Sequence, residues 1–227
     1  MHKTFKNNPL PVIFITLFLS AIGFGILIPI VPLILADPTS SFYLLPPTMS
    51  LSDGYFLVGI LTGVFPLAMF FSTPILGQLS DKYGRKPILA ISLFGTFISY
   101  VLFAVALLTK NLPLLFFSRI LDGVTGGNVS VAQAAIADVT KPENRAKNFG
   151  LIGAAFGLGF ILGPYIGGKL SDPTILPWFN AATPFWVAAG LALLDVIFIL
   201  TIFHETIKEK SVSASIHLGK AITNIFH

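Results

Sequence analysis

Arg119 and Asp122 are two charged residues that lie three positions apart within a long apolar segment. In a helix this spacing puts both side chains on one face, where a guanidinium and a carboxylate can pair. Ionised groups inside apolar helices usually line a pathway for ions or substrates. We therefore expect Arg119 and Asp122 to line such a pathway.

Asp195 is a third ionisable residue with apolar neighbours. A lone carboxylate in such surroundings is costly, so it is neutral or paired, and a neutral carboxyl can carry a proton. Two structural alternatives remain open. Arg119 can extend its charge to the nearby end of its helix, and Asp195 can pair with a polar group of another helix.

Other chemistries lack the residues that they need. The chain has no cysteine, which excludes a disulfide framework and a thiolate nucleophile. No G-x-x-x-x-G-K-[ST] loop occurs, so we expect no ATPase. The four histidines are scattered and match no zinc-site spacing: His2, His204, His217 and His227. We expect no catalytic residue, no metal and no cofactor, and hence no enzyme.

The composition indicates a membrane protein. Of 227 residues, 54 % are hydrophobic and 11 % are charged, whereas soluble domains are about 25 % charged. Four segments without a charged residue, of 30, 27, 23 and 21 residues, each reach the length of about 20 residues that a helix needs to cross a bilayer. The net charge of +4 does not indicate nucleic-acid binding, because the basic residues lie between the apolar segments.

We expect six transmembrane helices, at residues 11–35, 55–76, 87–108, 114–137, 149–168 and 184–203. The first segment lacks a small-residue cleavage site, so a retained helix is expected rather than a signal peptide. Eleven Lys and Arg residues fall in the loops of one side and two in those of the other, which predicts that both termini are cytoplasmic. Residues 1–205 then form the bundle, and residues 206–227 begin a cytoplasmic linker or tail.

The ends of the second and fifth expected helices are similar. Residues 74–81 read PILGQLSD and residues 164–172 read PYIGGKLSD, which match with one inserted residue. A repeat of three helices inserts in opposite orientations, although chance similarity of helix ends is an alternative. We expect an all-α membrane protein whose six helices form two inverted three-helix repeats, as in secondary transporters.

The loop after the second helix combines glycines with charged residues: Gly77, Asp81, Gly84, Arg85 and Lys86. Glycine permits a tight connection, and a carboxylate there needs a cation or a helix N-terminus as its partner. Such a bond can form in one conformation and break in another, so we expect a conformational latch. We expect Asp81 to pair with Arg85, with a helix terminus of a further bundle, or with both, and Arg85 to reach Asp138.

This loop resembles the G-x-L-a-D-r-x-G-R-K signature of the major facilitator superfamily. Residues 119–123 are similar to the R-x-x-x-G motif of that family, and residues 137–150 resemble a loop of its tetracycline-efflux-type members. Two helices resemble motifs of drug:proton antiporters, the first at Gly23, Gly25, Pro29 and Pro32, and the fifth at Gly159, Gly163, Pro164, Gly167 and Gly168.

The resemblance implies the N-terminal six-helix half of a drug:proton antiporter, because this family has twelve helices in two halves. It implies efflux of drug-like or small organic solutes, driven by the proton gradient, with Arg119 linked to proton transfer, and a multi-pass position in the cell (inner) membrane. The expected partners are membrane lipids, a small-molecule substrate, and a C-terminal six-helix half or a second copy of the chain, with no nucleic acid. We expect Arg119 and Gly163 to lie on the face that meets this partner.

The first helix also departs from the resemblance. We expect Ser20, Gly23, Pro29 and Pro32 to line a cavity, but tetracycline-efflux members carry an aspartate where this chain has Ser20. A counter-charge for the cation of tetracycline is thus missing there. Two other functions remain open: a truncated membrane protein without transport activity, or a six-helix carrier that acts as a homodimer. A reading frame for six further spans downstream of His227 would favour the half-transporter.

Overall fold

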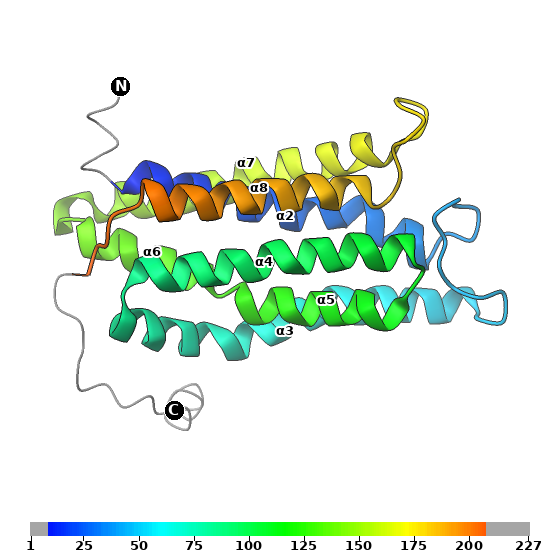
Figure 1. Ribbon diagram of the computed structural model, residues 1–227, viewed down its shortest axis with the longest axis horizontal. Coiled ribbons are helices and arrows are strands. Elements are labelled where there is room, and N and C mark those ends of the chain that lie inside the picture. The colour runs from blue at the N-terminus through cyan, green and yellow to red at the C-terminus, as the bar shows by residue number, and fades with distance from the viewer. Residues whose placement is uncertain (1–8, 208–227) are drawn as a thin grey trace.

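The computed structural model describes residues 9–207, and the expected linker or tail beyond residue 207 lies outside them. The described chain is a bundle of helices aligned with one long axis (Figure 1). The helices are α2 Leu10–Leu35, α3 Leu51–Tyr83, α4 Arg85–Leu108, α5 Leu112–Thr125, α6 Asn128–Val139, α7 Arg145–Ser171 and α8 Thr183–Thr201, with a 3₁₀ turn η1 at Pro142–Asn144. Helices satisfy their own backbone groups, which segments as apolar as these require inside a bilayer.

Five of these helical segments are long and apolar enough to cross a membrane: Leu10–Leu35, Leu51–Tyr83, Arg85–Leu108, Pro142–Ser171 and Thr183–Thr201. The expected helix at residues 114–137 is interrupted at Gly126 and Gly127, so α5 and α6 together cover that segment. A Cβ on Gly127 would lie 2.6 Å from Cδ1 of Leu76 in α3. The break therefore lies where the chain packs closely on α3, and the prediction of one continuous helix was wrong.

Helix α3 is longer at both ends than residues 55–76. Ser50 starts it with a capping box: its hydroxyl accepts the backbone N–H of Asp53 at 3.2 Å, and Asp53 Oδ2 accepts the N–H of Ser50 at 2.9 Å. Gly84 ends the helix at φ 113°, a backbone conformation that other residues adopt only with strain. Arg85 begins α4 directly afterwards, so the connection between the two helices is a single residue.

The packing of the helices follows the exchange expected for two inverted repeats. Helix α2 packs along α7, α5 packs along α3, and α4 packs along α8. Two inverted repeats are related by an axis that exchanges α2 with α5, α3 with α7, and α4 with α8. This exchange turns the α2–α7 contact into the α5–α3 contact and maps the α4–α8 contact onto itself. The similar sequences also end at opposite ends of the bundle, because α3 ends at the left and α7 at the right of Figure 1. The fold class predicted from the sequence is confirmed.

We call the end of the bundle that holds Gly84 the inner end, and the opposite end the outer end. The start of α2 and the end of α8 both lie at the inner end (Figure 1). One apolar cluster fills the inner half, with Ile13, Leu89 and Phe203 among its members, and another fills the outer half around Phe103 and Phe185. Polar side chains are buried as well: Thr16, Ser92, Thr96, Ser99, Asp122, Asn128 and Asp195.

Helices α2 and α7 meet along glycines. A Cβ added to Gly163 would lie 2.7 Å from Cα of Gly25, and one added to Gly167 would lie 2.7 Å from the carbonyl oxygen of Ile26. A Cβ on Gly159 would meet Ala21. Small residues let the two backbones approach closely. Close packing of this kind holds helices together in a bilayer, because an apolar side chain is as stable in lipid as in the protein interior.

Candidate functional site

Arg119 and Asp122 form a buried ion pair in the middle of α5. Nη1 of Arg119 donates to Oδ2 of Asp122 at 2.6 Å, and the two side chains are 3 % and 6 % exposed. The sequence prediction that they share one helix face inside the bundle is confirmed. The alternative, in which Arg119 extends to the end of its helix, is wrong.

Groups on two other helices complete the surroundings of the pair. The guanidinium of Arg119 lies 4.6 Å from the ring centre of Phe65 in α3, a cation–π contact. The hydroxyl groups of Thr96 and Ser99 in α4 lie beside the carboxylate of Asp122. Nε of Arg119 has no hydrogen-bond partner among the described residues. If Asp122 is protonated, the charge of Arg119 is left buried and unpaired, which is costly. Protonation of Asp122 therefore affects the side chains that surround the pair.

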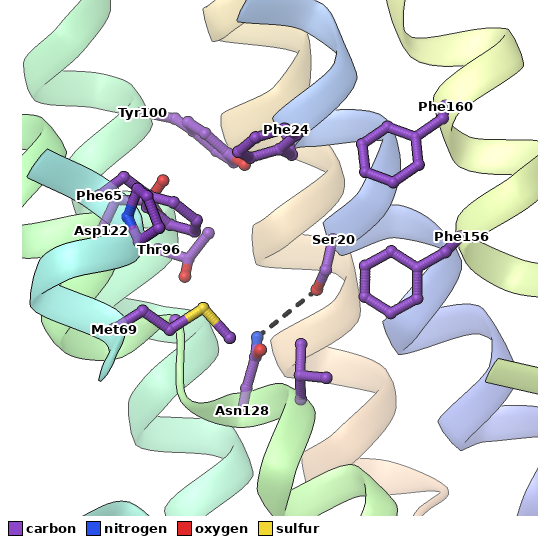
Figure 2. Close-up of a pocket in the computed structure, with 13 residues that line it drawn as sticks. Ser20, Phe24, Phe65, Met69, Thr96, Tyr100, Asp122, Asn128, Phe156 and Phe160 are labelled. Atoms are coloured by element: carbon purple, nitrogen blue, oxygen red, sulfur yellow. Dashed lines mark hydrogen bonds between the residues drawn. The ribbon is translucent and has the colours of Figure 1, made fainter. Parts of the chain in front are cut away.

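A largely apolar cavity of about 270 Å³ lies beside Asp122. Figure 2 shows the side chains of α3 and α4 on one side and those of α7 on the other, with Ser20 and Asn128 between them. Asn128 Nδ2 donates to the hydroxyl of Ser20 at 3.5 Å. The aromatic and sulfur-containing members of the wall are Phe24, Phe65, Met69, Tyr100, Phe156 and Phe160.

A second, smaller cavity of about 170 Å³ holds Arg119 in its wall, with apolar neighbours such as Val58 and Leu27. Phe24 lines both cavities, and its ring contacts those of Phe65 and Phe160 at 5.6 Å and 5.7 Å. The ion pair therefore presents its acid to one cavity and its base to the other.

Asp195 lies apart from this pair, between α8 and α2. The hydroxyl of Thr16 donates to its Oδ1 at 2.9 Å, while its Oδ2 has no partner among the described residues. The residue is 1 % exposed. The structural alternative, a contact with a polar group on another helix, is thus present, and a proton-carrying role stays a prediction. Thr16 was missed, although it lies one helical turn before Ser20.

A second cluster of charges surrounds Arg85 at the inner end. Its Nη1 lies 2.7 Å from Oδ1 of Asp81, and its Nε donates to Oδ2 of Asp138 at 3.1 Å. Both expected contacts of Arg85 are therefore present. Nη1 also donates to the hydroxyl of Ser80 at 2.6 Å, a contact that the sequence did not indicate.

Glu205 is the main residue of this cluster that sequence reasoning missed. Its Oε1 accepts the backbone N–H of Arg85 at 2.9 Å, and its Oε2 accepts that of Lys86 at 3.2 Å. These are first-turn N–H groups of α4, which have no partner within the helix. The hydroxyl of Thr206 donates to Oδ2 of Asp138 at 3.0 Å. An acidic residue just after the last apolar segment was the available signal.

Not every residue of the expected latch takes part in it. Gly84 has the positive φ that its position requires, and Lys86 contributes its backbone N–H. A Cβ on Gly77 would meet nothing within 4 Å, so the described bundle does not require glycine there.

The two antiporter-like motifs are also divided by the structure. Ser20 lines the larger cavity and Pro32 the smaller one, whereas Pro29 lines neither. Gly23 lines neither cavity, and a Cβ there would meet the hydroxyl and ring of Tyr100.

In α7, Gly159, Gly163 and Gly167 face α2, Pro164 lies against Gly25, and Gly168 faces open space. The expectation that Arg119 and Gly163 lie on the face that meets a partner is wrong, because Asp122 and Phe65 cover the first and α2 covers the second.

Comparison with known proteins gives one consistent family. The model of the Major Facilitator Superfamily matches residues 13–225. The class H tetracycline resistance protein of Pasteurella multocida is 36 % identical over 209 residues, which cover 92 % of this chain and 48 % of that protein. The class C tetracycline resistance protein of Escherichia coli is 39 % identical over 200 residues, covering 88 % of this chain and 46 % of that protein.

Among solved structures, the human organic anion transporter MFSD10 (TETRAN) superposes with a TM-score of 0.75 at 28 % sequence identity, covering 94 % of this chain and 52 % of that one. The chain thus spans about half the length of the curated relatives that it matches.

Proposed function

This chain belongs to the Major Facilitator Superfamily, and from that premise we propose that it is the N-terminal bundle of a proton-coupled transporter that expels small aromatic solutes. The observation that carries the proposal is the buried Arg119–Asp122 pair in the wall of an aromatic cavity. It is an integral membrane protein with several apolar spans. The excess of basic residues at its inner end supports a cytoplasmic position for that end, in the cell (inner) membrane.

The ion pair supplies the coupling. Protonation of Asp122 cancels its charge and leaves Arg119 without its counter-ion in an apolar site, which is costly. A proton on Asp122 and the Arg119–Asp122 bond are therefore alternatives, and each favours a different arrangement of the helices around the cavity. Because Asp122 lines the cavity directly, a bound solute changes the same equilibrium.

A second bundle is needed to close the cavity. In the apolar 18-residue stretch of each long helix, the share of residues buried inside the bundle differs strongly. It is 11 % for α3 and 17 % for α7, but 56 % for α2 and α4 and 50 % for α8. Glycines on α3 and α7 face open space within the described chain: Gly59, Gly63, Gly77, Gly150, Gly153, Gly157 and Gly168. Their exposed helix faces fit close packing against further helices, and the double length of the relatives supports a C-terminal half as the partner.

Transport then follows from rocking the two bundles around the cavity. The contacts of Arg85 with Asp81 and Asp138 hold the inner ends of α3, α4 and α6 together. Asp81 is 49 % exposed, so it remains available to a helix terminus of the second bundle. That contact forms when the inner side closes and breaks when it opens, which is the role of a latch.

The lining residues favour apolar, aromatic solutes, because six side chains in the wall are aromatic or contain sulfur. The acid Asp122 is already paired with Arg119, and Ser20 adds no charge. A neutral or anionic solute fits these charges better than a cation. Arg119 lines the smaller cavity, which favours an organic anion as a second candidate, in line with the human transporter MFSD10.

Everted membrane vesicles test the proposal. Cells produce the chain together with the C-terminal half of the class C tetracycline resistance protein, and an aromatic dye and the internal pH are followed after energisation. We expect dye uptake that an uncoupler abolishes and that Asp122→Asn removes, with Asp37→Asn in the outer loop as the control. Robust transport by the chain without any partner would favour a homodimer instead. No transport in either arrangement, with the chain inserted and folded, would favour the non-transporting alternative.

A further inference from the structure

Two buried polar atoms lie outside the coupling pair and have no partner among the described residues: Oγ of Ser92 in α4 and Oδ2 of Asp195 in α8. Both residues are 1 % exposed. Buried oxygens without a partner cost free energy unless water or a proton satisfies them. Their positions in the bundle indicate that they belong to one site.

The rings of Phe103 and Phe185, whose centres lie 4.2 Å apart, fix how α4 lies along α8. Ser92 lies eleven residues before Phe103 in α4, and Asp195 lies ten residues after Phe185 in α8. Because the two helices run in opposite directions, both steps lead towards the inner end, by about 16 Å and 15 Å at 1.5 Å per residue. The two unpartnered oxygens therefore lie at the same depth. Thr16 is bonded to Asp195 at 2.9 Å, so it lies at that depth too.

One helical turn further out lies a second group of polar side chains. Ser20 follows Thr16 by four residues and Thr96 follows Ser92 by four, steps of about 6 Å each. Asn128 donates to Ser20 at 3.5 Å, and Ser20, Thr96 and Asn128 all line the cavity that Asp122 lines. Figure 2 shows Asp122 and Thr96 together on one side of that cavity, with Ser20 and Asn128 between that side and Phe156.

We propose that Asp195 is a second proton-binding site, and that a hydrated row of hydroxyl groups leads from it to Asp122. The row consists of Thr16 and Ser20 on α2 and of Ser92 and Thr96 on α4. Steps of about 6 Å are too long for direct transfer, so one water bridges each of them. Oγ of Ser92 and Oδ2 of Asp195, which have no partner among the described residues, are free to bind such a water. The inference rests on the proposed proton coupling and names the route by which the proton leaves the pair.

The proton balance of the route is simple. Efflux driven by the proton gradient moves protons inward, so the proton leaves Asp122, and that carboxylate regains its negative charge and its bond to Arg119. Each hydroxyl or water in the row accepts one proton and releases another. The last transfer protonates Oδ2 of Asp195, because Oδ1 already accepts the hydroxyl of Thr16, and Asp195 becomes an anion again when it releases the proton to the inner side.

The surroundings of Asp195 suit a proton rather than a fixed ion pair. Helix α8 packs against α4, α2 and α7. Helix α2 contains no ionisable residue, and α4 contains only Tyr100 beyond Lys86. In α7 the ionisable residues lie near its two ends: Arg145, Lys147, Tyr165 and Lys169. Among the described residues no charged group contacts Asp195, so nothing competes with the proton.

The test uses the transporter with its partner bundle, reconstituted in vesicles. We expect Asp195→Asn and Thr16→Val to slow substrate-driven proton uptake about 100-fold, with unchanged substrate affinity, and Asp195→Glu to restore it in part. Thr201→Val is the matched control, because the exposed hydroxyl of Thr201 donates to the Ile197 carbonyl of its own helix. The infrared band of a buried protonated carboxyl should disappear in Asp195→Asn, which needs no transport to observe.

The two proposals fail in different ways. Proton uptake at the wild-type rate in folded Asp195→Asn, together with its loss in Asp122→Asn, overturns the relay and leaves the coupling pair intact. A wild-type protein that moves substrate without any proton overturns the proposed coupling and the relay with it. Equal slowing by Thr201→Val would also overturn the relay, because the effect would then not depend on the buried row.

Discussion

Glu205 caps the N-terminus of α4 although it lies 120 residues away from Arg85 in the sequence. Its two oxygens accept the first two backbone N–H groups of that helix, at 2.9 Å and 3.2 Å. The negative charge also lies at the positive end of the helix dipole. The segment that follows α8 is thereby tied to the same residue that binds Asp81 and Asp138.

We expect Glu205→Ala to lower the free energy of unfolding by about 1 kcal/mol, the usual cost of losing a helix cap. Thermal unfolding of the purified protein in detergent measures the change. Glu143→Ala is the control, because Glu143 lies in the exposed turn η1 at the same end of the bundle. A loss of the same size in both variants would contradict the cap.

Removing one partner of the buried pair should destabilise the protein strongly. We expect Arg119→Ala to cost about 3–5 kcal/mol, because Asp122 then remains as an uncompensated buried charge. The double variant Arg119→Met with Asp122→Leu should regain most of that stability but not proton coupling. Unfolding and proton-uptake measurements on the same samples separate the two effects, and a stable double variant that still couples would exclude the pair as the coupling site.

Gly84 and Gly77 should respond differently to alanine. At φ 113° a Cβ on Gly84 is strained, so we expect Gly84→Ala to destabilise the protein by about 1–2 kcal/mol. A Cβ on Gly77 would meet nothing within 4 Å, so the same change there should alter stability by less than about 0.5 kcal/mol. Denaturation midpoints of the two variants compare these values directly.

The contact between α2 and α7 offers a second matched pair of glycines. Gly163→Ala places a Cβ 2.7 Å from Cα of Gly25, and overpacking of this kind costs about 1–3 kcal/mol. Gly157→Ala, on the same helix, meets nothing within 4 Å and should leave the bundle alone intact. Thermal stability measured without a partner bundle tests this, and equal losses would show that the contact is not tight.

The outer loops should not contribute to pH dependence near neutrality. Hydrogen bonds from Thr39 and Thr174 lower the pKa values of Asp37 and Asp172 below the ordinary value of 3.8. Both carboxylates are ionised and hydrogen-bonded at any pH above 3.8, and they lose these bonds only when the pH falls through their lowered pKa values. We expect transport between about pH 5 and 8 to have the same pH profile in Asp172→Asn as in the wild type. An altered profile would place a coupling group in the loop.

Features decided within one helical turn could be predicted from the sequence. Arg119 with Asp122, three residues apart, and Asp81 with Arg85, four apart, are neighbours on any α-helix whatever surrounds it. Charge-free segments of about 20 residues have to be helical if they cross a bilayer, because no other open structure satisfies their backbone. The inverted repeat could also be predicted, because the ends of the second and fifth helices share a short local sequence pattern.

Contacts between helices were decided only by the tertiary structure. Whether Asp195 meets Thr16, and whether Gly163 faces α2 or a partner, depends on how each helix is rotated and shifted against its neighbours. Those rotations depend on the packing of side chains from residues about 50 to 180 positions apart, which no spacing along the chain records. Glu205 at Arg85 and the break at Gly126 and Gly127 belong to the same class. The sequence therefore determined which groups can act, and packing determined which of them meet.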